Sequence, residues 1–451
     1  MTFDPHLADR RFGTGLSPDI APPVSVDAVL SALSGPDAAA ARHPIPAYAD
    51  VTPSLATLRA LNRQRAEGAE AEAAFMAART AMHDLKVLHL ARSLARGVTT
   101  QDGFRERLTR FWADHFTTVA KNGYVHHLVT PYVEEAIRPR LTGRFGDLLV
   151  AAVTHPMMVL YLDQTGSVGP NSPVGTRTGR GLNENLAREV LELHTIGAGG
   201  PYTQTDVREL AELLTGLSRT PEGEPLYRPR FAEPGRETVL GTTFSDRADI
   251  STIEAALQAI AVHPATARHI AGKLSVHFVS DTPDASLVDA MADTFAVTGG
   301  DLAQVYEAML RHPAAWMRDA GAKVLTPYDF LQSSLRALAF APDGLDAPTI
   351  RRHLVGPMRT MGQDWERPPG PDGWAEEAEA WITPQGMAGR ITWAMQTPGM
   401  LMGDLPDPRA FVTAAMGPDV PDDLAFAARA AEDKAVGIGL ILTSAAFNRR
   451  G

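Results

Sequence analysis

The segment GLNENLAREVLELHTIGAGGPYTQTDVRELAELLTG, residues 181–216, has the pattern of two amphipathic helices joined by a glycine-rich turn. Its first part carries an apolar stripe with helical spacing, formed by Leu182, Leu186, Val190 and Leu193. Thr203 and Asp206 then match a capping box, in which two side chains satisfy free backbone N–H groups at a helix start. The segment therefore predicts helices over 182–196 and 203–214.

Similar spacing and strong helix formers recur along most of the chain. We expect a long helical stretch over 54–96, broken at Gly68, and further helices at 102–116, 130–136, 145–153, 253–262, 265–278, 302–310, 327–338, 350–360, 384–394 and 421–431. The best candidate for β structure is 225–243, where YRPRF and ETVLG could pair as a short hairpin with Pro229 at its edge. The sequence therefore predicts an all-α fold, a large multi-helix bundle with at most a short hairpin.

A weak internal repeat indicates two related helical lobes. RFWADHF at 110–116 is similar to KLSVHF at 273–278, and each copy continues through a Gly-Asp-Leu step to a His-Pro pair. Chance similarity between amphipathic helices is the alternative. Together with the chain length, the repeat suggests four regions. They are an N-terminal helical region (1–100), a central lobe (101–220), a second lobe (221–325) and a C-terminal helical region (326–451).

Composition excludes several classes of function. The chain has 451 residues, no cysteine and a formal net charge of −11. The lack of cysteine excludes disulfides, thiolate metal sites and cysteine nucleophiles. The acidic charge argues against general nucleic-acid binding, which needs a basic surface. No stretch approaches the ~18 uninterrupted apolar residues that span a bilayer.

The first residues, MTFDPHLADRRFGTGLSPDIAPP, lack a basic start followed by an apolar run. We therefore expect no signal peptide. The cytoplasm is the default expectation for the compartment, and export to the periplasm in complex with a partner is the alternative.

One acidic residue interrupts the apolar stripe of the first helix. At about 100° per residue, Glu189 falls on the stripe, and Asn185 and Glu192 border it. A buried carboxylate must be paired or protonated. Glu189 is therefore a candidate general acid/base, with Glu192 and His194 assisting. The alternative is a structural ion pair with an arginine such as Arg110.

Two irregular regions stand out, TGSVGPNSPVGTRTGRG at 165–181 and QDWERPPGPDGW at 363–374. Long loops are usually functional or disordered. The first loop leads into a helix N-terminus, where backbone amides favour anions. The candidate substrate-binding residues are therefore Asn171, Arg177, Arg180, Asn183, Asn185 and Tyr202. A mobile surface loop is the alternative, and the glycine spacing does not match a P-loop.

Four histidines could meet across the repeat and bind a metal, namely His115, His155, His277 and His312. Their spacing matches no strong metal motif. All four lie near helix ends or before proline, so capping is the simpler explanation. We therefore name no metal ligands and assign no cofactor, and the sequence leaves open whether a metal binds. No GxSxG elbow or dinucleotide fingerprint is present, and we expect Phe111, Trp112 and Phe116 in the core.

Several motifs together resemble a large bacterial family, domain of unknown function 1800. They are FWADHF at 111–116, HPMMVLYLDQTGSVGPNS at 155–172, the 181–216 segment, HPATARHIAGKLSVHFV at 263–279, KVLTPYDFLQSSLRAL at 323–338 and GPDGW at 370–374. The resemblance covers nearly the whole chain and implies a helical protein. It also implies a neighbouring partner that looks like a sulfatase or alkaline phosphatase.

The resemblance implies no established reaction. Family members commonly carry a His-Asp pair just before the stretch that matches 236–241, where this chain has Ala232-Glu233-Pro234. We therefore hold two hypotheses. The first is an accessory or binding protein that acts with the sulfatase- or phosphatase-like partner. The second is a hydrolase-type enzyme that uses a buried Glu as general acid/base on an anionic or sugar-like substrate.

Overall fold

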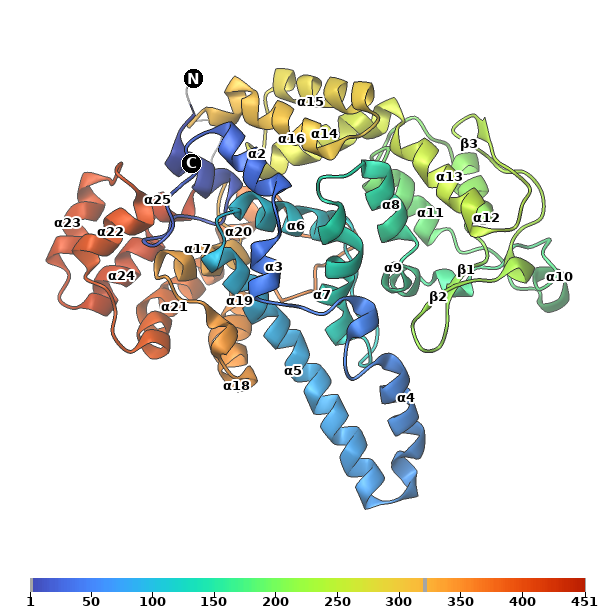
Figure 1. Ribbon diagram of the computed structural model, residues 1–451, viewed down its shortest axis with the longest axis horizontal. Coiled ribbons are helices and arrows are strands. Elements are labelled where there is room, and N and C mark those ends of the chain that lie inside the picture. Colours follow the sequence, from blue (N-terminus) through green and yellow to red (C-terminus); the bar gives the residue numbers. More distant parts are fainter. Residues whose placement is uncertain (1–2, 319–322, 451) are drawn as a thin grey trace.

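A computed structural model describes residues 3–318 and 323–450, and α-helices dominate it (Figure 1). Buried apolar side chains form two hydrophobic cores. The first core gathers residues between Leu7 and Trp316. The second joins the C-terminal half of α5 (Ala69–Thr99) to residues between Leu325 and Phe447. The all-α prediction is confirmed, and the four-part division of the chain stays a prediction beside these two cores.

Several helices of the first core begin at side-chain caps that the sequence supplies. Asp102 caps α6, and Thr203 and Asp206 form the predicted capping box of α12. The main helices of this core are α2 (Val26–Ser34), α6 (Gly103–His115), α7 (Val129–Tyr132), α8 (Phe145–Val153), α9 (Pro156–Tyr161), α11 (Asn185–Glu189), α12 (Gln204–Leu213), α13 (Ile250–Ala261), α14 (Pro264–Phe278), α15 (Ala285–Thr298) and α16 (Leu302–Arg311).

The second core forms a separate group of helices, drawn in orange and red in Figure 1. Its helices are α17 (Pro327–Ala337), α18 (Ala347–Ile350), α19 (Gly356–Thr360), α21 (Pro384–Met402), α22 (Pro408–Met416), α23 (Asp422–Ala430) and α24 (Lys434–Thr443). The helix α17 is buried along its whole length, because it packs against α5 on one side and α22 on another.

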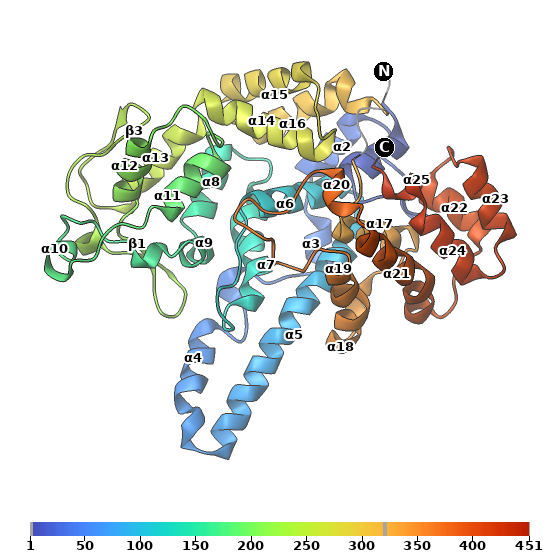
Figure 2. The ribbon, with the colours of Figure 1, turned by 180° about the vertical axis from the view of Figure 1, so that it is seen from behind.

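Two helices project from the body as an arm. The helix α4 (Leu55–Gln64) and the first half of α5 run side by side away from both cores (Figures 1 and 2). The predicted break lies at Gly68, whose φ of 157° suits a residue without a side chain. Leu58, Phe75 and Met82 are buried between the two helices, while most side chains at the tip are exposed.

The β structure differs from the prediction. YRPRF does not pair with ETVLG. Instead, β1 (Leu217–Arg219) pairs with β2 (Pro225–Tyr227), and β3 (Thr238–Val239) pairs with β4 (Thr242–Thr243). The reason is Pro229, which starts a short 3-10 turn, Pro229–Phe231, and so ends the strand before it can continue.

The two copies of the sequence repeat contact each other through their Gly-Asp-Leu steps. Phe145 N donates to Gly300 O at 2.8 Å, and Leu302 N donates to Gly143 O at 3.1 Å. In each copy the Gly-Asp-Leu sequence lies at the start of a helix, α8 or α16. A His-Pro pair then begins the following helical segment, which is α9 in the first copy and a 3-10 turn in the second. The shared order of elements agrees with two related helical lobes.

The two ends of the described chain lie close together (Figure 1). Arg10 Nη2 donates to Ala446 O at 2.7 Å and to Arg449 O at 2.9 Å. Within residues 3–318 and 323–450, no helix combines the length and apolarity that a membrane span requires.

Candidate active site

A cavity lies where elements of both cores meet. Its volume is about 170 Å³, similar to that of a cavity that holds a benzene-sized molecule. Its walls come from the ends of α5, α6, α7, α14 and α17, and the loop 363–376 contributes Gln363, Asp364, Trp365, Glu366, Trp374 and Glu376. The second irregular region of the sequence therefore forms one wall of this cavity.

Asp114, near the end of α6, contributes a carboxyl group to the cavity. The backbone N of Trp374 lies 3.1 Å and 3.2 Å from its two oxygens. Gly373 makes this approach possible, because a Cβ at that position would lie 2.6 Å from Asp114 Oδ2. Burial raises the pKa of Asp114 to about 7, and the negative charge of Glu376 acts in the same direction.

His277, at the end of α14, pairs with Glu376 in the same cavity. The distance from His277 Nδ1 to Glu376 Oε1 is 2.6 Å, and Lys323 Nζ lies 2.9 Å from Glu376 Oε2. Burial lowers the pKa of His277 to about 4. Burial alone would raise the pKa of Glu376, but His277 and Lys323 hold it below its usual range. The pair is therefore a neutral imidazole beside a carboxylate near pH 7.

Three arginines surround the fully buried Asp329 beside the cavity. They are Arg107, at 3.2 Å from Oδ2, and Arg110 and Arg450, which contact the two oxygens. Burial alone would raise the pKa of Asp329, but these guanidinium groups hold it well below its usual range. Arg110 also faces the cavity, and its guanidinium carbon lies 4.1 Å from the centre of the Tyr328 ring. The group has more positive than negative charge, which favours a developing anion nearby.

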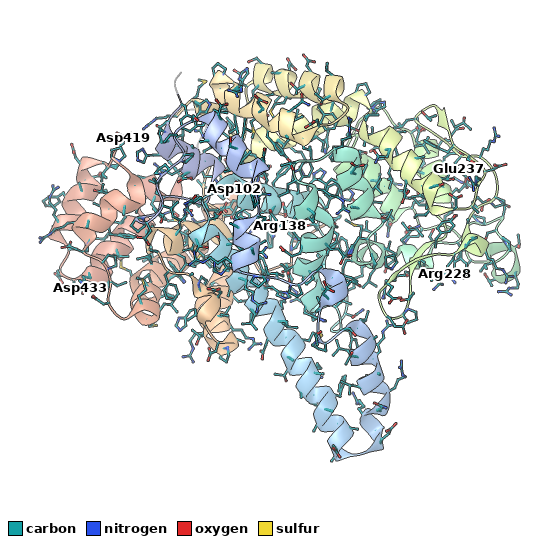
Figure 3. The ribbon with its side chains drawn as sticks, in the orientation of Figure 1. Asp102, Arg138, Arg228, Glu237, Asp419 and Asp433 are labelled. Atoms are coloured by element: carbon teal, nitrogen blue, oxygen red, sulfur yellow. The ribbon has the colours of Figure 1, made fainter. Side chains whose placement is uncertain are left out.

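The other cations of the cavity wall are neutralised. Arg138, labelled at the centre of Figure 3, contacts Asp37 Oδ2 at 2.6 Å and Glu106 Oε1 at 2.5 Å. Arg96 contacts Glu134 at 2.7 Å. These pairs hold α3 (Ala38–Arg42), α5, α6 and the residues after α7 together, so their role is largely structural.

The predicted polar helix lies outside this cavity, and none of its candidate residues is among the described lining residues. It consists of α11 followed by a π-helical turn, Val190–His194. Glu189 is half-buried rather than buried, and Arg110, its suggested partner, pairs with Asp329 instead. Burial raises the pKa of Glu189, and the charges of Glu192 and Asp372 add to the effect.

Glu192 has a partner on its own helix, whereas the end of the helix at His194 is contacted by two other helices. Glu192 pairs with Arg188 one helical turn away at 3.2 Å. His194 is buried, and its backbone oxygen accepts from His115 Nε2 at 3.1 Å, while Leu193 O accepts from His269 Nε2 at 3.0 Å. The two neighbouring rings therefore satisfy carbonyl groups at the end of the π-helical turn.

The glycine-rich loop is packed against the residues after β2. Gly169 N donates to Phe231 O at 2.8 Å, and Asn171 N donates to Glu233 Oε2 at 3.0 Å. Arg180 donates to Gly166 O at 3.0 Å, and Asn183 donates to Leu162 O at 3.0 Å. Asn185, Arg177 and Tyr202 lie at the surface or partly exposed. The binding roles of these residues stay predictions.

Capping accounts for two of the four histidines that were considered as metal ligands. His155 Nδ1 and His312 Nδ1 accept from backbone N–H groups two residues later, at 3.1 Å and 3.3 Å. His115 and His277 have the contacts given above and do not act as N-caps. Among the described residues, no group of three or more His, Asp or Glu side chains has the geometry of a metal site.

Sequence reasoning missed the cavity because its residues come from distant segments. Asp114 is in FWADHF, His277 in KLSVHF, Tyr328 in TPYDF and Trp374 in GPDGW, and all four line the cavity. Each of these motifs was used for the family resemblance, but none shows a strong catalytic spacing by itself. The useful signal was a polar residue at an otherwise apolar helix end in two of these motifs, Asp114 in FWADHF and His277 in KLSVHF.

The protein is therefore all-α, with a cavity where its two hydrophobic cores meet, and the lining of this cavity includes titratable and aromatic side chains. The family model described as protein of unknown function (DUF1800) matches residues 7–449, so the chain belongs to the DUF1800 family. No curated protein and no solved structure gives a significant match to this chain.

Proposed function

We propose that this protein is a hydrolase-type enzyme that acts on a small polar substrate, anionic or sugar-like, in the cavity between the two cores. The observation that supports the proposal is the presence of Asp114 and the His277–Glu376 pair in one cavity. The carboxyl group holds its proton up to about pH 7, while the imidazole stays neutral down to about pH 4. Such opposed shifts assign an acid and a base.

The proposed reaction uses one water molecule. His277 Nδ1–H donates to Glu376, which orients the ring and leaves Nε2 as the base. Nε2 takes a proton as the water oxygen bonds to the electrophilic atom of the substrate. Protonated Asp114 gives its proton to the leaving oxygen as the scissile bond breaks. Arg110 stabilises negative charge that develops between these steps. The proton on His277 then returns to solvent, and Asp114 is reprotonated.

The test is hydrolysis of 4-nitrophenyl esters, glycosides, phosphates and sulfates by the full chain. We expect Asp114→Asn and His277→Gln to lower kcat by about 10²–10⁴-fold against the best substrate. We expect kcat/KM to rise above about pH 4 as His277 loses its proton, and to fall above about pH 7 as Asp114 loses its own. Lack of hydrolysis in all four classes, or full activity of both variants, would contradict the proposal.

The earlier hypothesis that Glu189 is the acid/base, with Glu192 and His194 assisting, is tested in the same assay. The raised pKa of Glu189 supports it, because burial and two nearby carboxylates favour the protonated form. The variant Glu189→Gln removes the acidic group while it keeps the size of the side chain. If Glu189→Gln loses hydrolysis while Asp114→Asn stays active, the reaction takes place at the polar helix and not in the cavity.

The second candidate function is an accessory role beside a sulfatase- or phosphatase-like protein, and the arm formed by α4 and α5 supports it. A two-helix projection with exposed side chains at its tip gives a partner a surface remote from the cavity (Figure 2). Export with such a partner would place the protein in the periplasm.

Co-expression with the sulfatase-like neighbour tests the accessory role. We expect a stable complex with the full chain and none with a chain in which residues 62–80 are replaced by a short Gly-Ser turn. The unchanged circular dichroism of the remaining helices is the control. Absence of a complex with the full chain would contradict this role.

A further inference from the structure

Five residues that line the cavity carry a buried polar atom with no hydrogen-bond partner among the described residues. These atoms are Arg96 Nη2, Thr118 Oγ1, His277 Nε2, Trp365 Nε1 and Glu366 Oε2. A buried polar atom without a partner is destabilising, because it has lost its hydrogen bonds to water, and native proteins contain few such atoms. Their concentration around one cavity therefore points to a ligand that supplies the missing partners.

These five atoms differ in hydrogen-bonding character. Arg96 Nη2 and Trp365 Nε1 only donate, Glu366 Oε2 and the free nitrogen of His277 accept, and the Thr118 hydroxyl does both. A phosphate or sulfate group needs donors almost exclusively. A hydroxyl group donates one hydrogen bond and accepts others, so a mixed set suits a ligand with several hydroxyl groups.

The charges at the Glu366 end of the cavity also argue against an anionic ligand. Arg96 is paired with Glu134 at 2.7 Å, and Lys86 lies 3.7 Å from Glu366 Oε2. The Glu366 side chain is only 7% exposed, and burial raises the pKa of its carboxyl group, although Lys86 and Thr130 act against this shift. An anion at this position would lie beside that carboxyl group, and both nearby cations, Arg96 and Lys86, are already paired.

Flat aromatic surfaces line the same part of the cavity. Trp365 is partly exposed and stacks on the buried ring of Tyr328, with centroids 5.7 Å apart and planes inclined by 18°. Because Arg110 also lies over the Tyr328 ring, Trp365 supplies the aromatic surface of this pair that a ligand can reach. Trp374 lines the wall near Asp114. Amphipathic aromatic faces cover the C–H surface of a ring, while polar groups at their edges bind hydroxyls. Sugar rings present both kinds of surface.

The backbone holds Glu366 in an uncommon conformation. Its φ is 56°, a left-handed value that is strained for a residue with a side chain. Thr130 Oγ1 donates to Glu366 Oε1, which fixes the carboxyl group and leaves Oε2 free of hydrogen bonds. Strain of this kind persists where the surrounding structure holds a residue in place, and it is frequent in binding sites.

We propose that the cavity binds a neutral polyhydroxylated ligand, a sugar or polyol unit. The hydroxyl groups of the ligand bind Glu366, Arg96 and Trp365, and its reacting end lies between Asp114 and His277. The placement of the reacting end of the ligand between Asp114 and His277 rests on the proposed hydrolase function, whereas the binding of its hydroxyl groups at the Glu366 end does not. The site therefore selects the sugar-like substrate over the anionic one.

Isothermal titration calorimetry with the full chain tests this site. The neutral probes are glucose, N-acetylglucosamine, cellobiose and myo-inositol, and the anionic probes are glucose 6-phosphate, inorganic phosphate and sulfate. We expect a neutral probe to bind with a Kd below about 10 mM and more tightly than any anionic probe. We expect Glu366→Gln and Trp365→Phe each to weaken that binding at least tenfold, which is the loss of about 1.4 kcal/mol.

The control variant is Glu432→Gln, which removes an exposed carboxylate far along the chain in the second core region. It should leave the Kd unchanged, and circular dichroism should show that Trp365→Phe and Glu366→Gln are folded. Absence of neutral-probe binding below 10 mM, tighter binding of an anionic probe, or unchanged affinity in both cavity variants would overturn the proposal.

The hydrolase function and the ligand class can fail separately. If Asp114→Asn binds the neutral probe normally and retains full hydrolysis, the acid role of Asp114 is wrong while the sugar site stands. If Asp114→Asn abolishes hydrolysis of a phosphate or sulfate substrate and no neutral probe binds, the acid role stands and the sugar site is wrong.

Discussion

The polar helix and the cavity both contain a carboxyl group whose pKa is raised by burial, but different parts of the chain surround the two groups. At the polar helix, Glu189 is half-buried near Glu192 and Asp372, and Glu192 has an arginine one turn away. In the cavity, Asp114 is held by the backbone of a loop 260 residues distant in sequence. A dense run of polar residues in the sequence can simply form the exposed face of one helix, whereas the residues of an enclosed site come from segments that are far apart in the sequence.

The largest expected difference between the two regions concerns buried charge. Asp329→Asn leaves Arg107, Arg110 and Arg450 without their shared carboxylate, and we expect it to lower the free energy of unfolding by about 3–5 kcal/mol. Glu192→Gln breaks an exposed pair and should cost less than about 0.5 kcal/mol. Urea unfolding measures both. A loss below 1 kcal/mol for Asp329→Asn would contradict the comparison.

Two glycines with similar φ provide a second comparison. Gly373 has φ 84° and a Cβ there would meet the Asp114 carboxyl group, whereas Gly199, after the polar helix, has φ 73° and open space. We expect Gly373→Ala to cost about 3 kcal/mol and Gly199→Ala about 1 kcal/mol, the cost of the left-handed backbone alone. If urea unfolding shows equal losses of stability for the two variants, the loop around Gly373 can move away from Asp114 and does not hold it in place.

The pH dependence of stability separates the regions further. The folded Asp114 carboxyl keeps its proton to about pH 7, while the unfolded one loses it near 3.8, so its stabilising contribution is lost as pH rises between these values. Asp114→Asn is neutral throughout. The free energy of unfolding of this variant, relative to that of the native chain, should therefore increase by about 3 kcal/mol from pH 4 to pH 7 and level off above about pH 8.

Thermal unfolding across this pH range measures the difference, and the contributions of other groups cancel between the two chains. A difference that stays constant from pH 4 to pH 8 would mean that Asp114 titrates normally.

The smallest expected effect is at Glu189. Glu189→Gln removes repulsion from Glu192 and Asp372, so we expect it to stabilise the chain by up to about 0.5 kcal/mol at pH 8. Asn185→Ala, on the same helix, is the control for general changes to α11. Destabilisation by Glu189→Gln in chemical denaturation would show an undetected favourable partner and would restore the polar helix as a site.

Much of the fold could be predicted from local sequence. Gly68 breaks the long helical stretch, and Thr203 with Asp206 caps α12, because both signals act within a few residues. The helix α24 was missed, since Gly437 and Gly439 weaken its propensity and only packing stabilises them. The pairing of YRPRF with ETVLG was wrong, because the turn at Pro229 competes with the strand.

The cavity could not be predicted from the same signals. Asp114 precedes His115 in one motif, yet the first lines the cavity and the second contacts the end of the polar helix. Nothing near Asp114 in the sequence indicates that Trp374 would supply its hydrogen bonds. The left-handed backbone of Glu366 is likewise set by contacts across the fold.

The helix α5 joins the arm to the cavity without interruption. It has 31 residues, and Arg96, near its end, lines the cavity, whereas Ala69 lies at the tip of the arm. The segment between them is a rod roughly 40 Å long, so a tilt of about 5° at the cavity moves the tip by about 3 Å. The arm can then act as a mechanical lever that reports ligand occupancy. Spin labels at the tip and body, compared with and without a bound sugar, would show an unchanged separation if the lever does not operate.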